Sequence, residues 1–142
     1  MVQADVAMFT AVSHYFAGVA QIHSTKHSDD ESGGFRKAAP TFQRALDQLV
    51  IVNDCEERML KIAQPIEYSA YYVRRHQVAR HGTQDFRRGL ELMVKDLSDG
   101  YYPLNAFSML NPVLARLMAG WDLNARVEGL ITRLERAQSK TP

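Results

Sequence analysis

The sequence has little of what catalytic and disulfide-stabilised proteins require. It contains a single cysteine, Cys55, so no disulfide can form within the chain, and a reducing compartment is the simplest expectation. It has no glycine-rich phosphate loop, no Gly-x-Ser-x-Gly nucleophile turn and no His-Glu-x-x-His zinc helix. We therefore expect a protein that is not an enzyme, has no catalytic residues and uses no cofactor.

Long apolar runs are also absent. No run reaches the ~18 residues that a membrane-spanning helix needs. The first twenty residues carry no Lys or Arg but do carry Asp5, the reverse of the charge that begins a secretory signal peptide. These features predict a cytoplasmic protein without a membrane partner.

An excess of charge of one sign is the third absence. Lys and Arg number 17 against 16 for Asp and Glu, so the formal net charge is +1. No global field attracts nucleic acid or membrane, and an electrostatic function must come from local patterning. The 142 residues, 46% of them hydrophobic, suit one globular domain over 1–142 with its own core.

The apolar residues that are present recur at helical spacing. Sustained two-residue alternation is missing, so the sequence predicts no strand, and steps of three and four residues predict an all-α domain. We expect a single compact bundle of six to seven helices. The expected apolar stripes are Phe9, Val12, Phe16, Val19 and Ile22; Phe42, Ala45, Leu46, Leu49 and Val52; Phe86, Leu90, Val94 and Leu97; and Leu123, Val127, Leu130 and Leu134.

Glycines, prolines and capping residues divide this pattern. Residues 24–34 are polar and acid-rich and end in two glycines, which predicts a flexible loop. Pro40 fits the first turn of the next helix, and Asp54 with Glu57 predicts an interruption there. Gly82 and Gly100 are expected to end helices, and Asn111 followed by a proline is expected to start a short one.

A basic stretch between Tyr71 and Arg88 is the strongest local signal. Counting its arginines against Asp85 gives 5 − 1 = +4 over these residues with histidines neutral, in an otherwise balanced chain. Guanidinium groups bind phosphates through paired hydrogen bonds, and nearby tyrosines offer stacking faces, as in single-strand binders. The same arginines could instead meet carboxylates of this chain or of an acidic partner protein. The predicted nucleic-acid-binding residues are Arg74, Arg75, Arg80, Arg87 and Arg88.

Metal ligands are present but poorly arranged. His23 and His27 are four residues apart and are followed by acidic residues, all at the end of a helix or in the expected loop. His14 lies on the same helix as His23 but not at ligand spacing. No third ordered ligand is evident, so we expect no metal site.

The segment from Tyr101 to Leu110, with Met118 and Trp121 after it, concentrates large apolar side chains. A small helical domain needs most of these for its core. Any of Tyr101, Tyr102 or Trp121 that proves exposed is a residue type that anchors protein interfaces.

Three segments together suggest a family. "YSAYYVRRHQVARHG", then "FRRGLELMVKDL", then "LNPVLARLMAGW", resemble in order the small helical subunits of CRISPR RNA-guided effector complexes, over roughly residues 67–121. The resemblance implies a non-catalytic all-α subunit in antiviral defence. Copies would stack along a complex and line a groove for a target strand or guide–target duplex. The five arginines given above match the basic helix pair, whereas the near-neutral charge and acidic loop depart from a basic binder.

Two functions follow from these patterns. The first is a helical subunit of a nucleoprotein assembly that contacts the backbone of single-stranded DNA, RNA or a duplex without sequence preference. Its protein partners are other subunits or copies of itself. The alternative is a protein–protein interaction module, such as an adaptor, immunity or chaperone-like protein, whose basic face meets an acidic partner.

Overall fold

The described residues are folded as helices, in agreement with the sequence pattern. The computed structural model describes residues 2–25, 30–63, 69–121 and 123–139, with side chains other than those of residues 2, 56, 58–63, 69–80, 124, 138 and 139. They form α1 (Val2–Thr25), α2 (Glu31–Ala63), α3 (Ser69–Ser98), α4 (Leu104–Gly120) and α5 (Asn124–Ser139). The all-α class is confirmed, and this part of the chain has five helices instead of six or seven.

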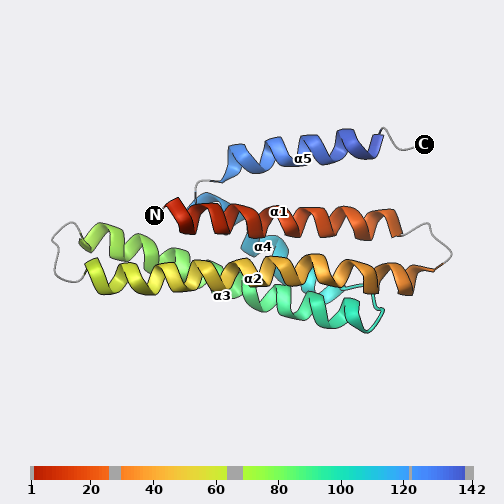
Figure 1. Cartoon of the computed structure of the whole chain (residues 1–142), viewed down its shortest axis with the longest axis horizontal. Coiled ribbons are helices and arrows are strands. Elements are labelled where there is room, and N and C mark those ends of the chain that lie inside the picture. The colour runs from red at the N-terminus through yellow and green to blue at the C-terminus, as the bar shows by residue number, and fades with distance from the viewer. Residues whose placement is uncertain (1, 26–29, 64–68, 122, 140–142) are drawn as a thin grey trace.

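Helices α1, α2 and α3 run antiparallel to one another in chain order (Figure 1). Helix α4 passes behind them and packs mainly against α3, whereas α5 lies along α1. Helix α2 has 33 residues and α1 has 24, so the hairpin of α2 and α3 extends past the N-terminal end of α1 (Figure 1). This hairpin carries the predicted basic stretch in its α3 arm.

Three predicted helix boundaries are wrong, and the two at Asp54 and Gly82 account for the smaller number of helices. Helix α2 continues through Asp54, α3 continues through Gly82, and α4 contains Pro112 instead of starting beside it. Pro40 also lies well inside α2 rather than in its first turn. Both prolines are exposed, so water can reach the carbonyl that an interior proline leaves without a donor.

Within the polar segment 24–34, where a loop was expected, residues 26–29 lie outside the described residues, and the others are helical except Asp30. Helix α1 continues to Thr25, and α2 begins at Glu31 and therefore includes Gly33 and Gly34. Asp30 explains this start, because its Oδ1 accepts a hydrogen bond of 2.9 Å from the backbone N–H of Gly33. A side-chain acceptor at this position satisfies one of the free donors of a helix N-terminus.

Tyr15 joins the first three helices in the core. Its ring makes edge contacts with Phe42 of α2 at 5.8 Å and with Phe86 of α3 at 6.1 Å between centroids. The residue is 3% exposed. Burial, and secondarily the nearby Tyr102, raises the pKa of the Tyr15 hydroxyl. This contact fixes α3 against α1 and α2, and so determines where α4 can pack.

Candidate interaction surfaces

All five predicted arginines lie on one continuous helix, α3, instead of on two helices separated by Gly82. The side chains of Arg74, Arg75 and Arg80 lie outside those that the structure describes. Arg87 and Arg88 are the two predicted binding residues whose side chains the structure describes.

Arg87 and Arg88 both have a carboxylate neighbour on their own helix. Arg87 Nε is 3.0 Å from Glu91 Oε1, and Arg88 Nη1 is 3.9 Å from Asp85 Oδ1. The two arginine side chains remain 61% and 71% exposed. Exposed ion pairs of this kind contribute about 0–1 kcal/mol to folding stability. The carboxylates therefore offset the charge of the two arginines without fixing the positions of their side chains.

The described side chains of α3, residues 81–98, form a balanced surface. Their positive groups are Arg87, Arg88 and Lys95 and their negative groups are Asp85, Glu91 and Asp96, with His81 neutral, which gives 3 − 3 = 0. The local excess of +4 expected from the sequence ends at Arg88, because the carboxylates that follow it belong to the same helix. Over these residues no uncompensated basic ridge is formed.

Neither a metal cluster nor a membrane-spanning helix is found in the described residues. No group of three or more His, Cys, Asp or Glu side chains there could hold an ion. His23 is exposed, and His27 lies outside the described residues. His14 is half-buried, and burial together with the positive charge of Arg44 lowers its pKa. No helix in this part of the chain is long and apolar enough to cross a bilayer.

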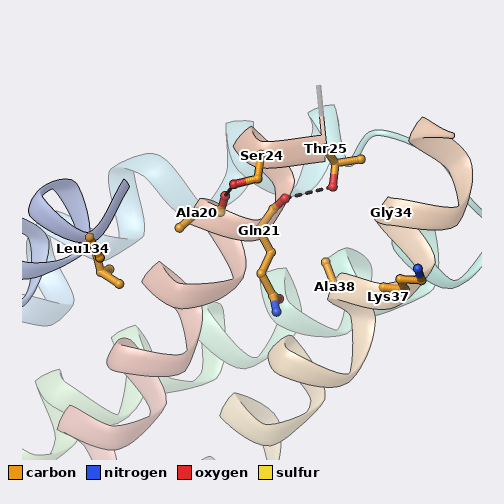
Figure 2. Close-up of a pocket in the computed structure, with 9 residues that line it drawn as sticks. Ala20, Gln21, Ser24, Thr25, Gly34, Lys37, Ala38 and Leu134 are labelled. Atoms are coloured by element: carbon orange, nitrogen blue, oxygen red, sulfur yellow. Dashed lines mark hydrogen bonds between the residues drawn. The ribbon is translucent and has the colours of Figure 1, made fainter. Parts of the chain in front are cut away.

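A groove lies between the ends of α1 and α2 and the C-terminal half of α5 (Figure 2). It has a volume of about 450 Å³. Its ionisable lining residue is Lys37, which Figure 2 shows beside Gly34 and Ala38. The Thr25 hydroxyl donates to the backbone oxygen of Gln21 at 2.9 Å and is thus engaged within the groove wall. One lysine among uncharged lining residues provides no acid–base pair for chemistry.

The outward side of α4 and the turn before it form a surface of a different kind. Tyr101 and Leu104 are 68% and 64% exposed, and Tyr102 and Met109 are also exposed. From Gly100 to Ala115 the sequence contains no Asp, Glu, Lys, Arg or His. We call this surface the α4 face, and define it by the exposed residues Tyr101, Leu104, Asn105, Ser108, Met109, Asn111, Pro112, Ala115, Arg116 and Ala119.

The turn at Gly100 positions the exposed tyrosine. Gly100 has φ +83°, which glycine adopts without strain. The Gly100 N–H donates to the Leu97 oxygen and the Tyr101 N–H donates to the Asp96 oxygen, each at 2.9 Å. These two bonds are the Schellman ending of α3. The chain then leaves α3 with Tyr101 directed away from the core.

Tyr102 and Phe107 hold the same corner onto the bundle. The Tyr102 ring lies 6.0 Å from that of Phe35 in α2 and 5.7 Å from that of Phe107 in α4. Ser32 also donates a hydrogen bond of 3.1 Å to the Gly100 oxygen. The corner is therefore braced against α2, and the exposed side chains project from a supported backbone.

The sequence identified only part of this surface. Tyr101 and Tyr102 were among the residues expected to serve as anchors if exposed, and both are exposed. Trp121 is 9% exposed and belongs to the core, as expected for most of this segment. The exposure of Leu104 and of the small residues after it was not foreseen. The signal that could have indicated it is the uncharged run up to Ala115.

Comparison with protein-family models, with curated proteins and with solved structures finds no match for this chain.

Proposed function

We propose that this protein is a non-enzymatic helical subunit of a larger assembly and that the α4 face is its main protein contact. The observation that carries the proposal is the exposure of Tyr101 and Leu104 on a surface whose charged member is Arg116 alone. Interface cores are depleted of charged residues and enriched in aromatic ones. Exposed apolar patches larger than a few hundred Å² are uncommon on monomeric proteins and mark interaction sites.

The resemblance to subunits of CRISPR effector complexes agrees with this role and stays a prediction. Both the proposed role and the resemblance imply a helical chain that contributes surfaces instead of chemistry. In such a complex the α4 face would contact another protein subunit, while α3 would be available for a nucleic acid.

The test is co-purification of the tagged chain from the cells that produce it. Leu104→Asp places a charge on the α4 face, and Thr132→Asp places the same charge on an exposed position of α5. We expect Leu104→Asp to lose its co-purifying proteins at least tenfold and Thr132→Asp to retain them. Equal recovery with both variants, each with wild-type circular dichroism, would show that the α4 face is not the contact.

A second candidate function is contact with a nucleic-acid backbone through α3. The observation in its favour is that all five arginines share one helix and that Arg87 and Arg88 stay more than half exposed. Their partners are also exposed, so a phosphate could replace a carboxylate at little cost. The balanced charge over residues 81–98 weighs against it.

Fluorescence anisotropy with single-stranded DNA and RNA tests this candidate. We expect binding to weaken as salt rises from ~50 to ~200 mM, with a salt slope that falls by about one for each phosphate contact removed. Combined alanine substitution of Arg74, Arg80 and Arg87 should abolish it, while Arg126→Ala on α5 is the matched control. Absence of binding at low salt, or binding that the triple variant leaves unchanged, would exclude the candidate.

A further inference from the structure

The α4 face is bulky at one end and small at the other. Leu104, preceded by Tyr101, stands at its start, and Ala119 stands at its end. Between them Ser108, Asn111 and Ala115 follow at steps of four, three and four residues, which keeps them on one side of the helix. All of these residues are exposed.

These positions are symmetric about the midpoint between Asn111 and Pro112. Leu104 and Ala119 are equally distant from this midpoint, and so are Ser108 and Ala115. If two such helices pack antiparallel about it, Leu104 of each helix meets Ala119 of the other, and Ser108 meets Ala115. Parallel packing would instead set Leu104 against Leu104 and leave Ala119 facing Ala119, which separates the backbones at one end and leaves a gap at the other.

The charge distribution also permits self-association. Identical faces repel each other when they carry like charges at facing positions, but here the charged residue is Arg116. In the antiparallel arrangement the two copies of Arg116 are about 14 Å apart along the axis, from a rise of about 1.5 Å per residue. This exceeds the screening length of about 8 Å at physiological salt. An acidic partner protein could pair its carboxylates with only one cation of the α4 face, Arg116.

We propose that the α4 face binds a second copy of this chain, with the two α4 helices antiparallel about a two-fold axis between Asn111 and Pro112. The inference rests on the proposed function, because it names the partner of the same surface. A two-fold contact requires one patch that complements itself, which the large residue at one end of the face and the small residue at the other provide.

The expected dimer is weak. A helix of 17 residues is about 25 Å long. A contact one helix wide over this length buries less than the ~800 Å² per partner of a standard interface. Micromolar or weaker association is therefore expected, and concentrations from about 5 to about 500 µM are needed to detect it.

Sedimentation of the full chain over this concentration range is the first test. We expect the mass to rise from the monomer's 16.1 kDa toward twice that value. Ala115→Glu, which places a longer, charged side chain against Ser108 of the other copy in place of a methyl group, should weaken dimerisation at least tenfold. Thr132→Glu on α5 should leave it unchanged. A monomer at every concentration, or a dimer that Ala115→Glu does not weaken, overturns the proposal.

Disulfide trapping tests the direction of packing. Under mild oxidation Asn111→Cys should form a cross-linked dimer, because its two copies face each other beside the axis. Leu104→Cys should not cross-link with itself, since its copies lie about 22 Å apart along the axis. It should cross-link when mixed with Ala119→Cys. The wild-type chain is the negative control, because its cysteine, Cys55, is buried and should not cross-link. Self-cross-linking of Leu104→Cys contradicts the antiparallel arrangement.

The two proposals fail in different ways. If the chain is monomeric but Leu104→Asp still loses its co-purifying proteins, the α4 face binds a different protein. The proposed function then holds, and only the proposal of a second copy as its partner is wrong. If Leu104→Asp loses nothing while the chain dimerises through another surface, both are wrong.

Discussion

Gly89 of α3 lies against Leu110 of α4 so closely that a Cβ atom at position 89 would overlap the Leu110 side chain. Both residues are buried, and Leu110 is 0% exposed, so it has little room to move. The absence of a side chain at position 89 sets the distance between α3 and α4. It thereby determines how α4 presents its exposed face.

Replacement of Gly89 by alanine is the first prediction. Inserting a methyl group into this contact should destabilise the fold by about 1–3 kcal/mol, despite the better helix propensity of alanine. Gly82→Ala is the matched control, because it lies on the same helix with Leu117 Cδ1 at an ordinary 3.7 Å. It should stabilise by about 0.5–1 kcal/mol. Urea unfolding measures both, and equal effects of the same sign would contradict the packing described.

The N-terminal cap of α2 gives the second prediction. Asp30→Ala removes the acceptor for the Gly33 N–H and should cost about 1 kcal/mol. For a chain of this size that lowers the midpoint of thermal unfolding by about 3 °C. Asp30→Asn retains an oxygen acceptor and should remain within a few tenths of a kcal/mol of wild type. An alanine variant as stable as the asparagine variant would show that the cap contributes nothing.

The buried hydroxyl of Tyr15 gives the third prediction, on alkaline stability. Its folded-state pKa is raised above the ordinary 10.0, so the folded protein keeps it protonated where the unfolded chain loses the proton. Stability is therefore complete below about pH 10 and falls as the pH rises above this value. Tyr15→Phe keeps the ring but has no ionisable hydroxyl, so the variant should lack the part of the stability loss above about pH 10 that comes from Tyr15.

Urea midpoints measured from about pH 8 to about pH 11 test that expectation. Tyr101→Phe is the control, since Tyr101 is 68% exposed and its loss should leave the wild-type profile. Parallel curves for wild type and Tyr15→Phe would contradict the assignment of the alkaline loss to Tyr15.

The ion pair between Arg87 and Glu91 gives the fourth prediction. A double-mutant cycle with alanine at both positions should yield a coupling energy below about 0.5 kcal/mol, because both side chains are more than half exposed. The coupling should shrink further in ~1 M salt. A coupling above about 1.5 kcal/mol would mean that Arg87 is held by its own helix and is not free to exchange partners.

Much of the core could be predicted from periodicity. Phe42, Leu49 and Val52 of α2 are buried as expected, as are Phe86, Leu90 and Leu97 of α3. The stripe expected on α1 was less accurate. Val12 and Ile22 are buried, but Phe9, Phe16 and Val19 are only half-buried, and Tyr15 was missed.

The reason for the error on α1 lies in its neighbours. Helix α1 is covered by α2 on one side and by α5 on another (Figure 1). Phe9 contacts the guanidinium of Arg126 in α5 at 6.0 Å, whereas Tyr15 faces α2 and α3. A helix covered on more than one side has no single apolar stripe, so its periodicity alone does not indicate which residues are most buried.

By itself the sequence determined that the chain is helical and which sides of α2 and α3 turn inward, because spacing and side-chain polarity act within one helix. Tertiary packing decided that α3 continues through Gly82, because alignment against neighbouring helices outweighs the propensity of one residue. It also decided that Leu104 stays exposed while Leu110 is buried, since both are leucines of the same helix. What separates them is the side of α4 on which α3 packs.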